Sequence, residues 1–535
     1  MFLFLEKYRH VFIIIAAVVL FTHTNCFHNN FVLDDRSVLL YDDNLSRTPV
    51  LDILAKPYKG FYRPFNHLVI KSMMPLLQGF PALYHGFNII IFSFMVFLFY
   101  IIILKLTGQT FLALLSCLLY AVHPLNTVYI ALKTGGFLCQ YVIFMQLSFI
   151  FFLRYLKQDE RRHFFLSLIF FTCSLFTHEI SFLLPVYLFL GMYFSGEKSL
   201  KKKIVLLFPY IIPVIIFITA RFAVLGMQFV GTYKIADAAQ LPITFHQYIT
   251  TIIKLAGWYV RQIFYPHDIL FVWDERVPLH PNLWVTVITL TAVSGIVFWS
   301  FFKKRSVVGF GLTLFLAGFS ILFVGSFIYY HKTRMAFIEP HWLHFNLIGA
   351  FIVISYYFLQ IKKVMNGQLW KVIMLGIFLV LGMYTINHNH VWRDEEVYST
   401  YWMQKNALNG VPWENKAREY ISRKKYLLNF PESLTCNSAC QLAMAYIIRR
   451  DGIAAASIYR RAIDQFPDCA HPFYGFSVLM HRAQDCQGSR IFLQKAKDMD
   501  PGLYPAYKII FDAMENKHGK DAVRKVSAML GVDKN

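Results

Sequence analysis

Two adjacent carboxylates, Asp34 and Asp35, follow the first apolar stretch of the chain, residues 11–22. Neighbouring acids repel each other, so at least one of them needs a cation, a proton or a hydrogen-bond donor beside it. A carboxylate held at a membrane surface can act as the general base that deprotonates a hydroxyl, or its oxygens can hold a divalent metal ion. The alternative is a solvated acidic loop, which is the interpretation that we favour for Asp42 and Asp43.

Two arginines have the chemistry of phosphate ligands. Arg63 lies in a Tyr-Arg-Pro segment, and Arg221 lies at the end of the apolar stretch 203–223. A guanidinium group can bind a phosphate through paired hydrogen bonds. Each arginine also has a structural alternative, in which its long side chain reaches the membrane interface and anchors the chain there.

Imidazoles and acids also lie beside apolar stretches. His123 precedes Pro124, and His178 and Glu179 occupy a predicted tight turn between two short apolar stretches. An ionisable side chain at the centre of a bilayer costs roughly 2.5–3.5 kcal/mol, so such residues usually face a cavity or one another. A packing role is the alternative for a single histidine.

The segment 331–344 has a composition that suits a sugar phosphate. Arg334 and His341 can bind a phosphate, Trp342 can stack on a sugar face, and Glu339 can accept hydrogen bonds from hydroxyls. The sequence lacks a phosphate-binding glycine loop, a nucleophile elbow, an HExxH motif and a CxxC pair. A divalent cation at Asp34 and Asp35 is therefore the one cofactor that remains open.

The elements that position these residues are predicted to be membrane helices. Of the 535 residues, 57% are hydrophobic and 16% are charged, whereas a soluble chain carries about 25% charged residues. This composition excludes a single soluble domain and a disordered or fibrous chain. We expect eleven spans, at 11–22, 84–106, 110–130, 136–156, 163–177, 180–195, 203–223, 283–302, 307–330, 343–361 and 369–388.

The basic loops predict the orientation of these spans. The clusters around Arg154, Lys201, Lys303 and Lys362 all fall on the side of the N-terminus, which the positive-inside rule makes cytoplasmic. The net charge of 52 − 31 = +21 is explained by these loops, so we do not expect a nucleic-acid partner. The candidate residues fall on the opposite side, in the predicted outer loops 23–83, 224–282 and 331–342. Residues 248–265 are predicted to form an interfacial helix there.

The chain changes character after residue 388. We predict a membrane domain at 1–388 and a second domain at 389–535, in which a pattern recurs every 34 residues: Ala462 and Pro467 return as Ala496 and Pro501. This period is typical of tetratricopeptide repeats, with units at 436–469 and 470–503 and a weaker third at 504–531. The shift brings Cys436 beside Cys469, a candidate disulfide on an oxidising side, and Cys440 competes for the same partner.

The order of these motifs resembles a known family. An Asp-Asp pair after the first span, a Tyr-Arg-Pro, an Ala-Val-His-Pro, an acidic tight turn, an Arg-Phe-Ala-Val-Leu-Gly, an acidic late loop and C-terminal repeats follow one another. This order is similar to that of the transmembrane and tetratricopeptide-repeat-containing O-mannosyltransferases and their bacterial relatives, which belong to the GT-C glycosyltransferases. The resemblance covers nearly the whole chain, and its specificity lies in the order of short motifs.

The resemblance implies an all-α GT-C membrane domain with a tetratricopeptide solenoid, and a sugar donor linked to polyprenyl or dolichyl phosphate. It implies inverting transfer to an acceptor, such as a protein hydroxyl, on the periplasmic or luminal side. One of Asp34 and Asp35 would be the base, with Asp34 slightly preferred. The residues that match donor-site motifs are Arg63, His123, Glu179, Arg221 and Glu339, and Trp392 and Glu395 match the motif that leads into the repeats.

Three departures from the family pattern leave the sugar open. Residues 134–138 lack the two charges that members often carry, His178 stands where lysine is common, and Glu339 is followed by Pro-His-Trp. Two alternatives therefore stand beside a protein-modifying enzyme. One is a GT-C enzyme that modifies a glycan or lipid, and the other is a non-catalytic scaffold or lipid transporter. The expected location is the bacterial inner membrane, with the endoplasmic reticulum as the alternative.

Overall fold

The computed structural model describes residues 6–35, 38–39, 43–58, 61–77, 80–196, 199–226, 244–269, 273–274, 306–333, 337–405, 452–482 and 485–504, and the single positions 291, 295, 436, 439, 440 and 443. The chain divides into two compact units. The first comprises residues 1–233, 244–275 and 279–394, and the second residues 234–243, 276–278 and 395–535. The main part of the second unit therefore begins close to the predicted domain boundary.

Helices make up almost all of the described secondary structure. The first unit contains α2 (Arg9–His23), η1 (Thr24–His28), α3 (Asp43–Arg47), α4 (Val50–Ala55), α5 (Pro64–Leu77), α6 (Pro81–Thr107), α7 (Thr110–Val122), η3 (Pro124–Asn126), α8 (Val128–Ala131), α9 (Gly135–Gln158), α10 (Arg161–Leu175), η4 (Glu179–Leu183), α11 (Leu184–Phe194), α12 (Leu200–Leu207), η5 (Phe208–Tyr210), α13 (Ile211–Leu225), α14 (Phe245–Phe264), α16 (Val307–Thr333), η6 (Pro340–Leu343), α17 (His344–Val364) and α18 (Gly367–Val391). Two short strands, β1 (Trp273–Asp274) and β2 (Phe337–Ile338), pair antiparallel.

Among the described residues, seven helical segments are long and apolar enough to cross a membrane: Arg9–His28, Ala82–Thr107, Gly135–Gln158, Leu200–Leu225, Val307–Phe327, His341–Val364 and Gly367–Val391. An eighth is formed if Thr110–Val122 and Pro124–Ala131, which meet at an angle of 64°, cross together. The break falls at Pro124, because proline lacks the N–H that would continue the helix. The prediction of an all-helical, multi-pass membrane protein is confirmed.

The predicted count of eleven spans is not matched among the described residues. The stretches predicted at 163–177 and 180–195 form α10 and the short apolar segment Glu179–Phe194, which are shorter than the seven span candidates. The span predicted at 283–302 lies outside the described residues. The predicted interfacial helix is α14, which packs along α16, where Tyr248 stacks on Tyr330 with ring centroids 4.7 Å apart.

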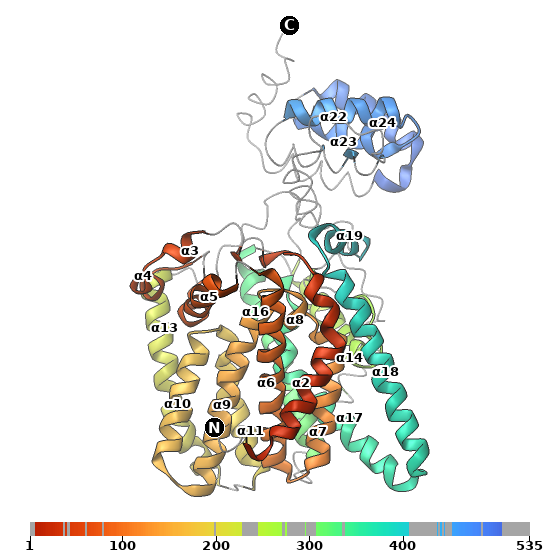
Figure 1. Ribbon diagram of the computed structural model, residues 1–535. Helices are drawn as coiled ribbons and strands as arrows, with labels where there is room; N and C mark the ends of the chain where they lie inside the picture. Colours follow the sequence, from red (N-terminus) through yellow and green to blue (C-terminus); the bar gives the residue numbers. More distant parts are fainter. Residues whose placement is uncertain are drawn as a thin grey trace. The chain divides into compact units, whose positions relative to one another are not determined.

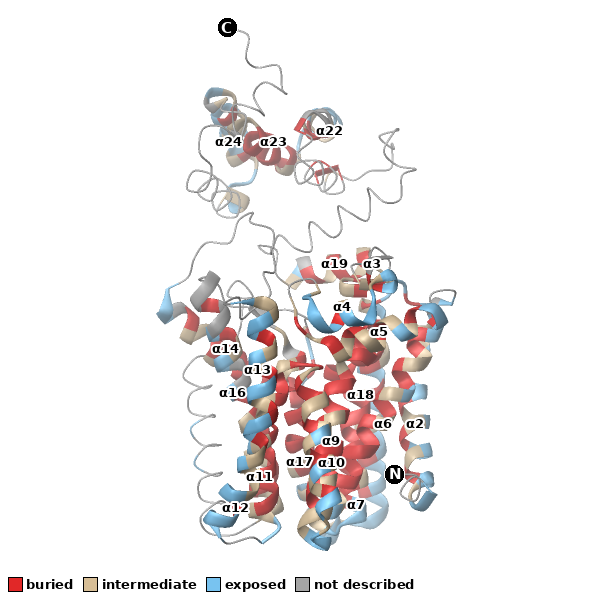
Figure 2. Cartoon of the chain, turned by 90° about the vertical axis from the view of Figure 1, so that its left-hand side faces the viewer, coloured by how far each residue is buried: buried red, intermediate tan, exposed pale blue. Residues whose placement is uncertain are grey.

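The outer helices present apolar side chains that no other part of the unit covers. On α13, Ile212 and Ile215 are more than half exposed, and on α18 the same holds for Val372, Leu375 and Leu379. Figure 2 shows the contrast between such exposed positions and the buried interior. Such an exposed apolar surface is stable when the hydrocarbon core of a membrane surrounds it.

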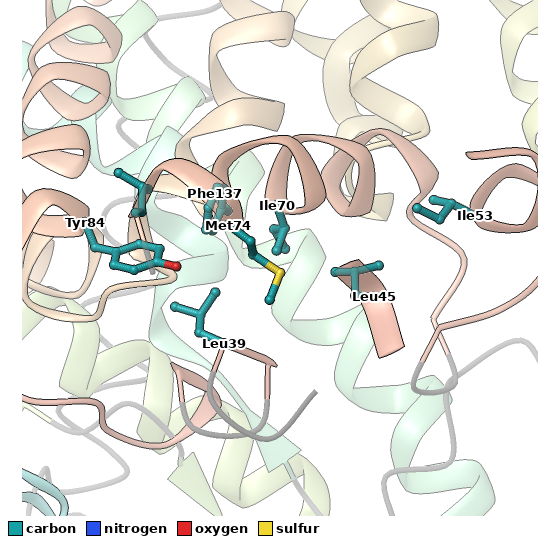
Figure 3. Packing of buried hydrophobic residues seen from close by; sticks show 8 residues of the cluster. Leu39, Leu45, Ile53, Ile70, Met74, Tyr84 and Phe137 are labelled. Carbon is teal, nitrogen blue, oxygen red and sulfur yellow. The ribbon is translucent and has the colours of Figure 1, made fainter. Parts of the chain in front are cut away.

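Short helices lie across one end of the bundle (Figure 1). They are α3, α4 and α5, and their apolar side chains pack on the ends of α6 and α9. The buried members of this cluster are Leu39, Leu45, Ile53, Ile70, Met74, Leu77, Tyr84 and Phe137 (Figure 3). The beginning of α2 and the α9–α10 and α17–α18 connections lie at the opposite end (Figure 1). The loop that carries Asp34 is therefore anchored to a hydrophobic core at the end of the bundle away from these basic connections.

The second unit contains α19 (Glu395–Lys405), α22 (Gly452–Gln465), α23 (Ala470–Arg482), α24 (Cys486–Met499) and η7 (Pro501–Leu503). Helices α22 and α24 have the same length, and both ends are offset by 34 residues, since 486 − 452 and 499 − 465 both equal 34. Ala462 and Ala496, at equivalent positions, are both buried. A disulfide bond joins Cys436 to Cys469, whereas Cys440 is a free, buried thiol.

A close backbone approach between two helices of the bundle yields a prediction for stability. A Cβ atom at Gly349 of α17 would overlap the carbonyl oxygen of Gly311 in α16, whereas one at Gly376 of α18 would meet nothing within 4 Å. We expect Gly349→Ala to destabilise the protein by about 1–3 kcal/mol through overpacking. Gly376→Ala is the matched control, and its effect should be neutral or slightly stabilising. Thermal unfolding of the detergent-solubilised variants measures both, and equal midpoints would contradict the close approach of the two helices.

Candidate functional site

The structure separates the roles of the two adjacent acids. Asp35 is fully buried, and its carboxylate accepts backbone N–H groups from Val32, Lys133 and Thr134 at 3.3, 3.0 and 2.7 Å. Burial raises the pKa of Asp35 to about 6, although these hydrogen bonds oppose the shift. Asp34 is only partly buried. Asp35 therefore ties the first loop to the turn before α9, and Asp34 is the acid that a substrate can approach.

The backbone is strained immediately before this pair. Leu33 has a φ of 50°, a left-handed conformation that is costly for a bulky side chain. Such strain persists only where the surroundings over-determine it, and it is concentrated at functional sites.

The buried side-chain amide of Asn88 stabilises the turn whose backbone N–H groups bind Asp35. Asn88 of α6 donates to the carbonyl oxygens of Ile130, Leu132 and Lys133, and its own carbonyl accepts the N–H of Gly136 at 3.1 Å. A Cβ atom at Gly136 would overlap the Asn88 side chain. Glycine is therefore required at position 136 by packing.

Lys133 is the residue that the sequence analysis missed. Its ammonium group donates to the carbonyl of Asn29 and lies 3.2 Å from Nε2 of His85, and it sits over the ring of Phe31. Burial lowers the pKa of Lys133 to about 8, while the negative charge of Asp35 opposes this shift. The available signal was that Lys133 is the one charged residue in the short connection between the predicted spans 110–130 and 136–156.

One carboxylate binds both candidate phosphate ligands. Glu179 accepts hydrogen bonds from Nε of Arg63 at 2.9 Å and from Nη1 of Arg221 at 2.6 Å. The loop with Arg63 is held there because the N–H of Phe65 donates to the carbonyl of Phe176. Burial alone would raise the pKa of Glu179, but Arg63, His178 and Arg221 outweigh it and hold this pKa below its usual range. The three paired side chains carry one net positive charge.

The late loop adds a second carboxylate. Oε2 of Glu339 accepts the indole N–H of Trp342 at 3.1 Å and lies 3.3 Å from Nε2 of His341. The residue before it, Ile338, pairs with Trp273 in the β1–β2 ladder. Burial and the negative charge of Asp34 raise the pKa of Glu339 to about 7, against the effect of Arg63. Asp34 and Arg63 are therefore both close enough to act on Glu339.

Most of the sequence-predicted residues meet at this place. They are Asp34, Asp35, Arg63, His178, Glu179, Arg221, Glu339, His341 and Trp342. His123 has a different setting, because its Nε2 lies 3.2 Å from the carbonyl of Ile263 in α14 and its Nδ1 accepts the N–H of Leu125. Arg334 lies outside the described residues.

The assembled groups define what the site can do chemically. Asp34 and Glu339 can accept protons, and the paired arginines offer positive charge beside them. Within the described ranges, no group of three or more His, Cys, Asp or Glu side chains is placed to hold a metal ion. A scan of the chain against models of known protein families found no match, and a search of curated proteins found none.

The ion triad yields a prediction for stability. Glu179→Gln removes the only negative charge of the triad and leaves two arginines, of which Arg221 is 4% exposed. Breaking a fully buried ion pair from one side costs about 3–5 kcal/mol, and because Glu179 is 24% exposed the cost here should lie at the lower end of that range, which still lowers the thermal midpoint by several degrees. The matched control is Asp52→Asn, which removes an exposed pair with Lys56 and should change stability by about 0.5 kcal/mol at most. A similar small effect of both substitutions would show that the triad is not a buried structural unit.

Proposed function

We propose that the chain is a membrane glycosyltransferase of the GT-C type. It transfers a sugar from a polyprenyl-phosphate or dolichyl-phosphate donor to an acceptor hydroxyl, most simply that of a protein. The observation that carries the proposal is that Asp34 and Arg63, which forms a triad with Glu179 and Arg221, both lie within electrostatic reach of Glu339 at one end of a bundle of membrane-spanning helices. A membrane-embedded lipid phosphate reaches such a place without leaving the bilayer.

In the proposed mechanism, Asp34 is the general base. It takes the proton of the acceptor hydroxyl as the oxygen attacks the anomeric carbon, and the bond from that carbon to the phosphate oxygen breaks on the opposite face, so the configuration inverts. Negative charge develops on the leaving lipid phosphate. Arg63 and Arg221 stabilise this charge, and their guanidinium groups need little reorganisation because Glu179 already fixes them. Asp35 takes no part in proton transfer and positions the loop.

The second unit is proposed to be a tetratricopeptide solenoid that binds the protein acceptor or another partner. The 34-residue offset between α22 and α24 supports this proposal, because stacked repeats present a concave binding surface. The Cys436–Cys469 disulfide supports a location on an oxidising side, which is the periplasm if the protein lies in a bacterial inner membrane and the lumen if it lies in the endoplasmic reticulum.

Asp34→Asn tests the proposed base. We expect this variant to lose transfer by a factor of about 10²–10⁴, the usual contribution of a general base, with an unchanged thermal midpoint. Asp35→Asn should instead lower stability by about 1–3 kcal/mol, because its amide nitrogen cannot accept the backbone N–H groups that the carboxylate binds. The measurement is transfer of labelled sugar from lipid-linked donors, combined with thermal unfolding of each variant.

Three outcomes of this experiment distinguish the alternatives. Normal transfer by Asp34→Asn would contradict the mechanism. Loss of modified glycans or lipids with intact modification of proteins would identify a GT-C enzyme with another acceptor. A cellular role that tolerates Asp34→Asn but requires the second unit would indicate a scaffold.

Glu339 predicts the pH dependence of transfer. Its carboxyl is neutral below its pKa of about 7 and ionised above it, and the added negative charge beside Asp34 makes Asp34 a stronger base. We therefore expect the transfer rate to rise with pH between about 6 and 8. Glu339→Gln, which imitates the neutral form, should remove this rise, whereas the control Glu160→Gln, on the exposed α9–α10 connection, should keep it. A rise that persists in Glu339→Gln would assign the titration to another group.

A further inference from the structure

Aromatic and imidazole side chains connect the two charged parts of the site through the interior of the bundle. The ring of His178 lies 4.8 Å from that of Tyr141 in α9, and the ring of Tyr129 in α8 lies 4.8 Å from that of His344 in α17. His344 lies in turn 6.3 Å from His341. The hydroxyl groups of Tyr129 and Tyr141 lie near each other.

The two ends of this series of aromatic and imidazole side chains contact the charged groups already described. His178 lies 3.5 Å from Glu179 at one end, and His341 lies 3.3 Å from Glu339 at the other. Arg63, which binds Glu179, also acts electrostatically on Glu339. Five separate elements of the fold therefore contribute side chains to one continuous ring of polar and aromatic groups.

Apart from the approach of the two tyrosine hydroxyls to each other, three polar atoms of Tyr129, Tyr141 and His344 have no hydrogen-bond partner within the described part of the chain. They are the hydroxyls of Tyr129 and Tyr141 and Nδ1 of His344, and all three atoms are inaccessible to solvent. An unpaired buried polar group is costly, and native proteins pair nearly all such groups with protein, water or ligand. Two other buried tyrosines of the bundle are paired, since Tyr120 donates to the carbonyl of His344 and Tyr187 donates to Asn346, whereas the hydroxyl of Tyr100 has no partner among the described residues.

The chemistry of the two phenols and the imidazole indicates which class of ligand they would bind. Phenol and imidazole rings offer flat apolar faces together with hydrogen-bonding edges. A sugar ring has the complementary features, with C–H groups on its faces and hydroxyls around its rim. A phosphate fits Arg63 and Arg221 better than it fits two neutral phenols, and an acyl chain would leave the unpaired atoms unsatisfied.

We propose that Tyr129, Tyr141 and His344 form the subsite that binds the sugar of the lipid-linked donor. The inference rests on the proposed function. The subsite lies between the triad, which binds the phosphate, and the Asp34–Glu339 side, from which the acceptor attacks. The two phenolic hydroxyls and the imidazole hydrogen-bond the sugar hydroxyls, and these contacts determine which monosaccharide the enzyme accepts.

The test compares the binding of two probes to the full-length protein in detergent. One probe is a short-chain polyprenyl phosphate, and the other is the same lipid carrying a monosaccharide, supplied as a panel of hexoses. The variants are Tyr129→Phe, Tyr141→Phe and the double substitution, which remove hydroxyls but keep the rings. The control is Tyr100→Phe, which removes an equally buried and unpartnered hydroxyl from α6 beside Tyr8, where ring centroids are 5.8 Å apart.

We expect the wild-type protein to bind at least one sugar-bearing lipid more tightly than the bare phosphate. The double variant should lose about tenfold in affinity for that lipid, the effect of two hydrogen bonds, and should keep its affinity for the bare phosphate. Tyr100→Phe should leave both affinities unchanged. None of the substitutions should lower the thermal midpoint, because each removes a polar group that is unpaired in the folded protein.

The possible failures can be told apart. If the double variant keeps the full preference for the sugar-bearing lipid, the subsite is wrong and the proposed function stands. If the wild-type protein binds both probes equally, the subsite is also wrong, while binding of the lipid phosphate is supported. If the wild-type protein binds neither probe, the proposed donor and the subsite both fail.

Discussion

The binding of two arginines by one partly buried carboxylate, Glu179, constrains the whole site. Removing Arg63, Glu179 and Arg221 from water is expensive, and the cost is offset only when the charges meet with good geometry. Glu179 begins η4, Arg63 precedes α5, and Arg221 lies in α13. These three elements therefore meet at one point. The same constraint places the guanidinium group of Arg63 within electrostatic reach of Glu339, on which Asp34 also acts.

The second constraint is carried by backbone atoms. Asp35 binds three N–H groups, and Asn88 binds the carbonyl oxygens of the turn that supplies two of them. A side chain that binds backbone groups fixes the path of the chain and not merely the place of another side chain. Asp34 is attached directly to this rigid loop, so its position does not depend on a flexible connection. This arrangement suits a general base that must meet a substrate held by other elements.

The sequence predicts the membrane class and most residues of the site, because charges and imidazoles are rare in apolar surroundings and are therefore conspicuous. Asp34, Arg63 and Glu179 were found in this way. The sequence does not predict the role of Asp35, because hydrogen bonds to backbone N–H groups about a hundred residues away produce no recognisable sequence motif. Tyr129 and Tyr141 were not predicted as site residues, because the chain has 31 tyrosines and a tyrosine in an apolar stretch does not by itself indicate a functional site.

The hydrogen bonds of the site indicate which parts are complete without a ligand. The carboxylate of Glu179 is satisfied by two guanidinium groups, and that of Asp35 by backbone donors. The hydroxyls of Tyr129 and Tyr141 are not satisfied by the described protein groups. Folding alone gains nothing from polar atoms at those two positions, since phenylalanine would fill the same space without the cost of an unpaired hydroxyl. An occupant that supplies the missing hydrogen bonds would account for them, and, unlike Tyr100, Tyr129 and Tyr141 lie beside the histidines that contact the charged groups of the proposed reaction.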